Sequence, residues 1–374
     1  MSHFIKKLHL RNLLSFEDCE VELQNLNILI GPNGAGKSNL IEAIGLLRSL
    51  VYDHAAYVRQ GGGSTAWIWK GQRGESAQMD TLIDGGAHGD LLHSFKMDGT
   101  AAGLTWEQLL IVNTESYSFK RESGQLSISQ GYSGPYTSSE SVFHKYKDPA
   151  DKSPTTRTGE RIGEIRIYRE FRTGKNEMLR SGGPGSGLEA THLEEGGQNL
   201  ALVLHEFDSL GRLDQIRGLL EELNQGYRNI KPRFLNGIWL VQLNEEGLLD
   251  PVMSQRISDG TLKFICLAAL LLDPSPPPVI CIEEPEVGLH PDAMRVVARL
   301  LREAADRTQL IVTTHSADMI DEFSGTPEAV VVTEKNERHA TQFNRLDRDK
   351  LASWLGRYQL GELWQKGEIG GSRW

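Results

Sequence analysis

Residues 31–38 read GPNGAGKS and fit the pattern G-x-x-x-x-G-K-[ST] in full. Glycines in such a turn let successive backbone N–H groups face a phosphate, and a helix that follows adds the positive end of its dipole. The Lys37 ammonium would then reach the β- and γ-phosphates of a nucleotide, and the Ser38 hydroxyl would coordinate Mg²⁺. A chance match is the alternative, but the apolar strand before the turn and the helical pattern after it favour a phosphate-binding loop. The residues expected at the nucleotide are Asn33, Gly34, Ala35, Gly36, Lys37, Ser38 and Asn39.

Two carboxylates follow a second apolar segment, residues 279–282. Glu283 at the tip of such a strand could hold Mg²⁺ through water, and Glu284 could polarise the attacking water as a general base. Taken alone, an acidic pair after a strand is most often solvated turn chemistry. A phosphate-binding loop earlier in the chain favours the catalytic interpretation.

Two further turns could complete the site. Residues 313–316 (TTHS) follow the next apolar segment, where His315 could sense the γ-phosphate or be an ordinary turn histidine. Ser258 and Gly260 open an apolar helical pattern over residues 262–272, and a helix N-terminus of this kind can bind an anion. Ser258 is equally a good N-cap. Its position shortly before the acidic strand favours the anion site.

The elements that must position these groups alternate between strand and helix. Strand patterns cover residues 4–16, 26–30, 237–243, 279–282, 310–313 and 329–333, and helical patterns cover 38–50, 199–207, 213–224, 262–272 and 292–305. Such alternation predicts an α/β fold with a mainly parallel sheet covered on both faces. Residues 113–198 are instead rich in Ser, Gly, Tyr and Thr, and are expected to be an inserted polar, β-rich region.

Composition excludes several classes of protein. The chain has 374 residues, 39% of them hydrophobic, and 40 basic against 50 acidic residues give a net charge of −10. No apolar run approaches the roughly 18 residues of a membrane span, and the first residues have no signal-peptide core. Three cysteines give neither a disulfide framework nor a metal pattern. We therefore expect a reduced, cytoplasmic protein without membrane contact; its acidic balance argues against a general nucleic-acid coat.

In this order the motifs resemble the ABC-type ATPase head of the RecF, SMC and overcoming-lysogenisation (OLD) proteins, most closely the compact stand-alone ATPases of that group. The resemblance covers residues 1–60 and 195–374. It identifies residues 31–38 as Walker A, 257–261 as the signature, Glu283 as the end of Walker B, Glu284 as the catalytic base, 288–291 as the D-loop and His315 as the switch histidine.

The resemblance implies a P-loop NTPase fold with a mostly parallel core sheet, an antiparallel β lobe and a helical signature lobe. It implies ATP and Mg²⁺ as cofactors, and a homodimer in which the signature of one head closes on the nucleotide of the other, with a higher oligomer as a further option. The divisions expected are residues 1–112 with Walker A, the inserted region 113–198, and residues 199–374 with the remaining motifs.

Departures from the pattern modify these expectations. Asp259 stands where transporter heads carry glycine, and Glu283 stands where aspartate is commoner, so slow or regulated hydrolysis is expected. Leu14 replaces the usual basic residue of the first strand motif, and Gln78 is a candidate for the Q-loop glutamine. The absence of heptads excludes a long SMC-type coiled coil. Too few residues follow Ser316 for a TOPRIM nuclease domain, so a nuclease would be a separate chain.

A basic stretch, residues 161–180, interleaves six basic residues with Tyr168 and Phe171. This is the best DNA-contact candidate, centred on Arg166, Arg169 and Arg172. The alternative is a half-exposed strand over residues 165–171 with solvated charges. The D-x-D spacing at Asp347 and Asp349 is interpreted as solvated charge.

The functions weighed from these features are three. The first is a dimeric ATP-hydrolysing switch in genome protection, such as anti-phage defence, with a separate nuclease or toxin as effector. The second is a RecF-like repair ATPase whose closed dimer grips DNA. The third is a nucleotide-gated scaffold that scarcely hydrolyses ATP.

Overall fold

The computed structural model describes residues 3–71, 76–99, 103–129, 131–146, 151–184 and 191–371. Its centre is a six-stranded sheet whose order is β10-β15-β16-β3-β17-β18. The strands are β3 (Leu26–Ile30), β10 (Arg166–Tyr168), β15 (Val279–Glu283), β16 (Gln309–Thr313), β17 (Val330–Lys335) and β18 (Thr341–Arg345). All neighbours are parallel except β17 and β18. The carboxyl ends of β3, β15 and β16 therefore meet at one edge of the sheet.

The central strands are apolar along nearly their whole length because both faces of the sheet are covered. Ile280 and Ile282 of β15 belong to one core, shared with α9 (Asp259–Leu271) and α10 (Asp292–Ala305). Val279 and Cys281 belong to a second core, shared with α1 (Lys37–Ser49). This alternation is the two-residue period of a strand. The two helices that begin at the predicted phosphate-binding turns, α1 and α9, thus pack on opposite faces of this sheet.

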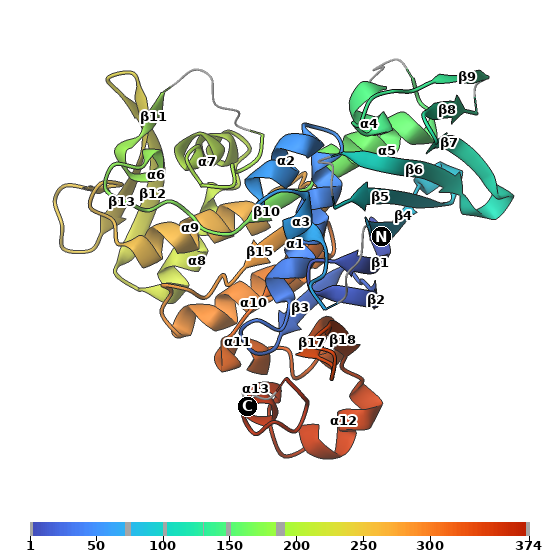
Figure 1. Cartoon of the computed structure of the whole chain (residues 1–374). Coiled ribbons are helices and arrows are strands. Elements are labelled where there is room, and N and C mark those ends of the chain that lie inside the picture. The colour runs from blue at the N-terminus through green and yellow to red at the C-terminus, as the bar shows by residue number, and fades with distance from the viewer. Residues whose placement is uncertain are drawn as a thin grey trace.

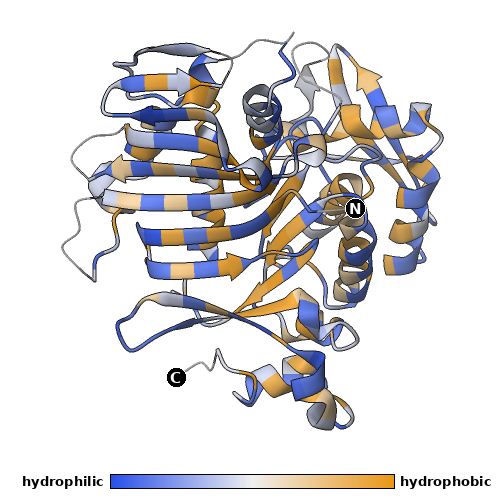
Figure 2. Ribbon diagram, turned by 90° about the vertical axis from the view of Figure 1, so that its right-hand side faces the viewer, coloured by the Kyte–Doolittle hydropathy of each residue, from blue (hydrophilic) through white to orange (hydrophobic). Residues whose placement is uncertain are grey.

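A large antiparallel sheet packs beside α1 and contributes to the second core (Figure 1). Its order is β2-β1-β4-β5-β6-β7-β8-β9. The strands are β1 (Ile5–Leu13), β2 (Phe16–Glu22), β4 (Ser76–Asp84), β5 (Asp90–Asp98), β6 (Leu104–Ile111), β7 (Ser116–Glu122), β8 (Gln125–Ile128) and β9 (Tyr132–Pro135). Figure 2 shows these strands stacked, with apolar and polar residues alternating along them. The pair β6–β7 spans the predicted division at residue 112.

Short helices flank this sheet and α1. They are α2 (His54–Gln60), α3 (Ser64–Trp67), α4 (Val142–Lys145) and α5 (Pro154–Gly163), and 3₁₀ turns cover Gly86–His88, Val112–Thr114 and Pro327–Ala329. Within the described residues, no helix combines the length and apolar character needed to cross a bilayer.

A third lobe surrounds the start of α9, on the left of Figure 1. It contains α6 (Met178–Ser181), α7 (Leu200–Ser209), α8 (Leu213–Leu223), β11 (Gly183–Pro184), β12 (Tyr227–Leu235), β13 (Ile238–Glu245) and β14 (Val252–Met253). At the bottom of the same view lie α11 (Ala317–Asp321), α12 (Arg348–Leu355) and α13 (Leu360–Gln365). Asp347 accepts the backbone N–H of Asp349 at 2.9 Å as the N-cap of α12, and both aspartates are exposed.

The predicted fold class is confirmed: a mostly parallel core sheet, an antiparallel β lobe and a helical lobe are all present. One element differs from its expected place. The alternating segment 165–171 was interpreted as a half-buried strand within the inserted region. Only Arg166–Tyr168 form a strand, and this strand pairs with β15 in the central sheet, where Ile167 and Tyr168 are buried.

Candidate active site

The glycine-rich turn connects β3 to α1 and is shaped by its neighbours. Gly31 has φ +146° and Gly36 has φ +114°. A Cβ at Gly31 would lie 2.2 Å from the Thr333 carbonyl oxygen, and one at Gly36 would lie 2.2 Å from Thr341 Oγ1. Only glycine allows both the backbone conformation and the close approach of β17 and β18. The turn therefore has the local geometry that its sequence pattern predicts.

Lys37 folds back onto this turn. Its Nζ donates to the carbonyl oxygens of Gly31 at 2.8 Å and Pro32 at 3.1 Å, and only 5% of the residue is exposed. Burial lowers the pKa of Lys37 to about 8, although Glu284 and Glu286 favour the charged form. Asn33, Gly34 and Ser38 are exposed, Asn39 is half-buried, and Ala35 and Gly36 are buried.

Ser38 and Glu283 join the two predicted motifs directly. Ser38 Oγ donates to Glu283 Oε2 at 2.8 Å, so the first turn of α1 touches the end of β15. Mg²⁺ in nucleotide sites is usually held by one or two protein oxygens, with phosphates and water as its other ligands. A hydroxyl and a carboxylate in contact, at the start of a phosphate-binding helix, fit that donor set.

Glu284 and His315 lie at the ends of neighbouring parallel strands. His315 Nε2 is 3.5 Å from Glu284 Oε1, and the Glu284 side chain is 45% exposed. Glu284 has φ +45°, and its N–H donates to the Thr313 carbonyl oxygen at 3.0 Å. A non-glycine residue in this conformation is strained, and such strain clusters at functional sites. The hydrogen bond to β16 holds Glu284 in this conformation.

Glu286 is a further acid that sequence reasoning missed. Its Oε1 accepts the His315 N–H at 2.7 Å and the Thr314 hydroxyl at 2.8 Å. Its Oε2 is buried with no hydrogen-bond partner in the described structure, and burial raises the pKa of this carboxyl group. Glu286 therefore ties the turn containing His315 to the turn that follows Glu284.

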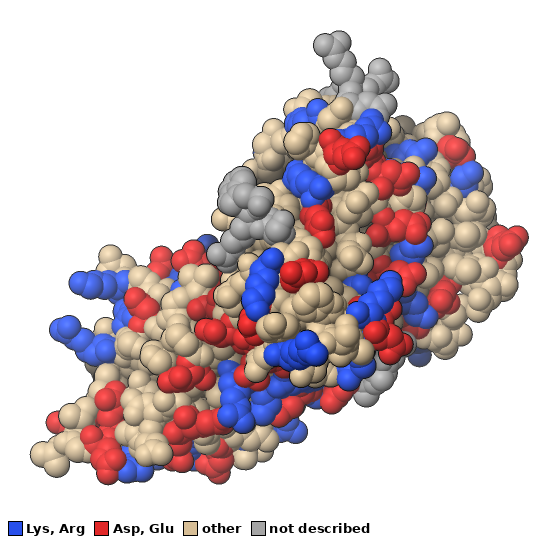
Figure 3. Space-filling model, turned by 90° about the horizontal axis from the view of Figure 1, so that it is seen from below, with Lys and Arg blue, Asp and Glu red and all other residues tan. Residues whose placement is uncertain are grey.

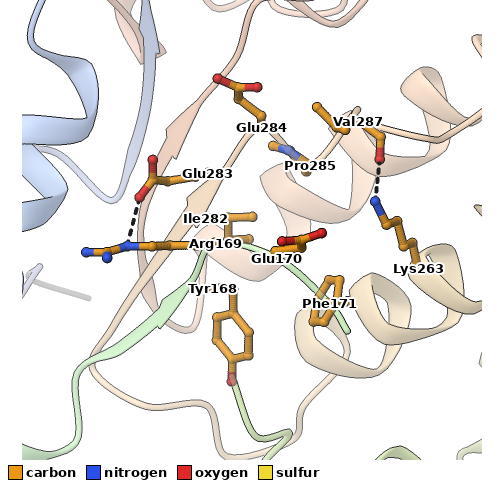
Figure 4. A pocket seen from close by; sticks show the side chains of 10 residues that line it. All are labelled: Tyr168, Arg169, Glu170, Phe171, Lys263, Ile282, Glu283, Glu284, Pro285 and Val287. Carbon is orange, nitrogen blue, oxygen red and sulfur yellow. Dashed lines mark hydrogen bonds and ion pairs between the residues drawn. The ribbon is translucent and has the colours of Figure 1, made fainter. Parts of the chain in front are cut away.

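Arg169, one of the candidate DNA-contact residues, lies against Glu283 (Figure 4). Its Nε is 3.1 Å from Glu283 Oε1, and its Nη2 is 2.8 Å from Oε1 of Glu42 on α1. The Tyr57 hydroxyl donates to the other Glu42 oxygen at 3.0 Å. Desolvation alone would lower the pKa of Arg169, but Glu42, Tyr57 and Glu283 outweigh it and the pKa is raised. Glu42 was also missed, although helical spacing places it one turn after Ser38.

A cavity of about 290 Å³ opens beside these groups. Arg169, Glu283 and Glu284 line one part of it, and Lys263 and Val287 line another (Figure 4). Gln78, the candidate Q-loop residue, is on β4 and donates to Asp80 at 3.0 Å; it does not line this cavity.

Ser258 and Gly260 lie on a second cavity, of about 590 Å³, which is also lined by Gly288 and His290 of the predicted D-loop. Ser258 is the N-cap of α9: its Oγ accepts the Thr261 N–H at 3.1 Å. A Cβ at Gly260 would lie 2.7 Å from the Gly288 carbonyl oxygen, so glycine permits this contact between the predicted signature and the predicted D-loop. The structure thus brings Lys37, Ser38, Glu283, Glu284 and His315 together and places the signature at a separate cavity.

Arg180 contacts the turn that contains the predicted signature. Its buried guanidinium donates from Nη1 to the carbonyl oxygens of Ser254 at 3.1 Å and Ile257 at 2.7 Å. Its Nη2 pairs with Asp259 at 2.5 Å. Arg180 belongs to the basic stretch in the sequence, and in the structure it holds the turn before α9.

Other members of the basic stretch also make intramolecular contacts. The Arg161 guanidinium lies 4.1 Å above the Phe4 ring, and Arg166 Nη1 donates to the Gly163 carbonyl oxygen at 3.3 Å. Arg166 and Arg172 line a shared cavity. On the face seen in Figure 3, basic and acidic side chains are interspersed. DNA contact near Arg166, Arg169 and Arg172 stays a prediction.

Crystal structures of Smc head domains have a similar fold. The Smc head bound to the C-winged helix domain of ScpA matches with a TM-score of 0.61 and 14% identity over 93% of this chain and 99% of that chain. The head with an extended coiled coil bound to the C-terminal domain of ScpA, derived from Pyrococcus furiosus, has a TM-score of 0.58 and 13% identity over 94% and 98%. The head from Pyrococcus yayanosii gives 0.53 and 11% over 94% and 99%.

A family model also matches the sequence, over residues 26–321. Its description is "AAA domain, putative AbiEii toxin, Type IV TA system". The matched residues run from β3 to α11 and include the Walker A turn, the signature, Glu283, Glu284 and His315. The chain therefore belongs to this AAA-domain family of P-loop ATPases, and its fold is similar to that of Smc heads.

Proposed function

We propose that two copies of this chain bind ATP and Mg²⁺ between them and hydrolyse the ATP slowly, as a switch in genome protection. The observation that carries the proposal is the 2.8 Å contact between Ser38 Oγ and Glu283 Oε2, because it unites the phosphate-binding helix with the acidic strand. Glu284 and His315 lie at the same edge of the sheet, where the chemistry of hydrolysis would take place.

Nucleotide binding is assigned to the turn before α1. Backbone N–H groups of residues 33–38 and the α1 dipole would receive the phosphates, and Lys37 would leave its carbonyl partners to contact them. Asn39 lies next to Ser38 on the same helix turn. Mg²⁺, held by Ser38 and Glu283, would neutralise charge on the phosphates.

Hydrolysis is assigned to Glu284. Its exposed carboxylate can accept a proton from the attacking water, and its strained backbone fixes where the carboxylate lies. His315, held in place by Glu286, can donate a hydrogen bond to phosphate oxygens that gain charge. Glu283 in place of aspartate and Asp259 in the signature support a slow rate.

The second head is proposed because Ser258 and Gly260 line a different cavity from Glu283 and Glu284. Ser258 is exposed at the N-terminus of α9, and Gly260 and His290 lie on the same cavity. A helix N-terminus can receive the γ-phosphate of nucleotide bound by a partner copy. ATP would thus link two heads, and its hydrolysis would release them.

The biological role is proposed from the family. Its description names an AbiEii toxin of a type IV toxin–antitoxin system, which supports a role in defence. The anti-phage role and the separate effector chain are the further parts of the proposal. All three cysteines are buried and free, which supports a reduced, cytoplasmic setting. In the repair alternative DNA itself would stimulate turnover, so DNA-dependent hydrolysis without a partner protein would favour it.

Nucleotide binding and phosphate release by three variants test this function. Lys37→Ala should abolish binding, whereas Glu284→Gln should keep binding and arrest turnover. Glu303→Gln, on the exposed end of α10, is the matched control and should behave as wild type. Normal turnover in Glu284→Gln would refute the assignment of the base. A wild-type chain that binds ATP but hydrolyses it no faster than Glu284→Gln would favour the nucleotide-gated scaffold.

A further inference from the structure

Arg169 occupies a position between two carboxylates that belong to different elements. Its Nε contacts Glu283 Oε1 at 3.1 Å, at the end of β15, and its Nη2 contacts Glu42 Oε1 at 2.8 Å, on α1. The second Glu283 oxygen accepts the Ser38 hydroxyl at 2.8 Å. Both oxygens of Glu283 are therefore engaged, one by the hydroxyl expected to bind metal and one by a cation of the chain itself.

Glu42 has a second hydrogen-bond partner besides Arg169. Its other oxygen accepts the Tyr57 hydroxyl at 3.0 Å. Gly45 of α1 leaves room for Tyr57 in this position, since a Cβ there would lie 2.2 Å from the Tyr57 hydroxyl oxygen. Glu42 would therefore still bind Arg169 after the contact with Glu283 breaks.

We propose that Arg169 is the counter-ion that Mg²⁺ displaces from Glu283, and that Glu42 retains Arg169 in the site when this happens. The inference rests on the proposed Mg–ATP site and adds a residue that sets its metal affinity. A guanidinium and a divalent cation cannot both lie against one carboxylate without strong repulsion. Arg169 thus lowers the affinity for Mg²⁺ and neutralises two acids until the metal arrives.

The size of the effect follows from exposure. The Arg169 side chain is 48% exposed and that of Glu283 is 18% exposed. An ion pair that is half open to water shifts an equilibrium by about fivefold at most. We expect Arg169→Gln to lower the half-saturating Mg²⁺ concentration about threefold. Arg169→Lys keeps the positive charge but loses the guanidinium group that contacts both carboxylates. Its half-saturating Mg²⁺ concentration should therefore lie between those of Arg169→Gln and the wild type.

The test is binding of a fluorescent ATP analogue to the full chain, followed by anisotropy, in EDTA and across a Mg²⁺ titration. All variants carry Glu284→Gln so that hydrolysis does not interfere. Arg172→Gln is the matched control, because Arg172 lines a different cavity, and its Mg²⁺ dependence should be unchanged. Thermal melting checks that each variant is folded.

Glu42→Gln should raise the half-saturating Mg²⁺ concentration, and this effect should vanish in Arg169→Gln/Glu42→Gln if Glu42 acts through Arg169. An effect that persists would overturn the retaining role of Glu42.

An unchanged or raised Mg²⁺ requirement in Arg169→Gln would overturn the counter-ion role. Weaker binding in EDTA would overturn it too, and would make Arg169 a phosphate ligand. A parent chain that binds no nucleotide under either condition would refute the proposed function itself, and the inference with it.

Discussion

Ser258 is the N-cap of α9, and in the proposed function it is also the serine of the signature. Its Oγ accepts the Thr261 N–H at 3.1 Å, and loss of such a cap costs about 1 kcal/mol. Ser258→Ala should therefore lower the melting temperature by only about 1 °C in a chain of this size. If the hydroxyl also contacts nucleotide on a second head, the same variant should lose ATP-dependent dimerisation while still binding ATP.

Ser258→Asn isolates the two effects. Asparagine is as good an N-cap as serine, so the free energy of unfolding should return to within a few tenths of a kcal/mol of wild type. Its larger amide group does not reproduce a hydroxyl at the partner's phosphate, so dimerisation should stay impaired. Urea denaturation measures the first quantity, and light scattering in the Glu284→Gln background measures the second. Recovery of dimerisation in Ser258→Asn would show that Ser258 is only a cap.

Three other perturbations test parts of the structure that support the site. Burial lowers the pKa of His54 to about 4 from the ordinary 6.5. Between pH 7 and pH 4 this imidazole therefore takes up a proton in the unfolded chain but much less in the folded one, and the free energy of unfolding should fall by about 3 kcal/mol. Urea denaturation of His54→Gln should show a fall in the free energy of unfolding between pH 7 and pH 4 that is smaller than that of the wild type by about this amount. A fall equal to that of the wild type would contradict a buried neutral imidazole. Arg180→Met leaves buried carbonyl groups without their donor and should cost about 3–5 kcal/mol in the same assay, with dimerisation impaired; a change below about 1 kcal/mol would contradict its role under the signature. Glu286→Ala frees the turn that contains His315 and should slow single-turnover hydrolysis at least tenfold without changing ATP affinity; unchanged turnover would contradict that role.

Local sequence patterns were sufficient to predict the elements that have a clear periodicity or motif in their own residues. The helix expected over residues 292–305 is α10 with the same bounds, because its apolar face repeats at helical spacing. The Walker A turn was predictable because Gly31 and Gly36 are required by backbone conformation. Glu283 and Glu284 could be placed because a short apolar run ends at them, and the sheet brings them to Ser38 and His315.

The residues that were missed depend on contacts between distant segments. Arg169 and Arg180 belong to a basic run that gives no hint of their partners, which are Glu42, Glu283 and the turn before α9. Whether an arginine is solvated or buried is decided by tertiary packing and not by its neighbours in sequence. Segment 165–171 was interpreted as a half-buried strand of the inserted region, and its alternation gave no sign that Arg166–Tyr168 pair with β15 in the central sheet.

The most direct test of the central claim is the solution mass of Glu284→Gln, measured by light scattering with and without ATP and Mg²⁺. An ATP-linked pair of heads predicts a monomer that doubles in mass when both are added, and a Ser258→Ala derivative that does not. A mass that stays at the monomer value in both conditions would contradict the claim that the signature of one copy acts on nucleotide held by another.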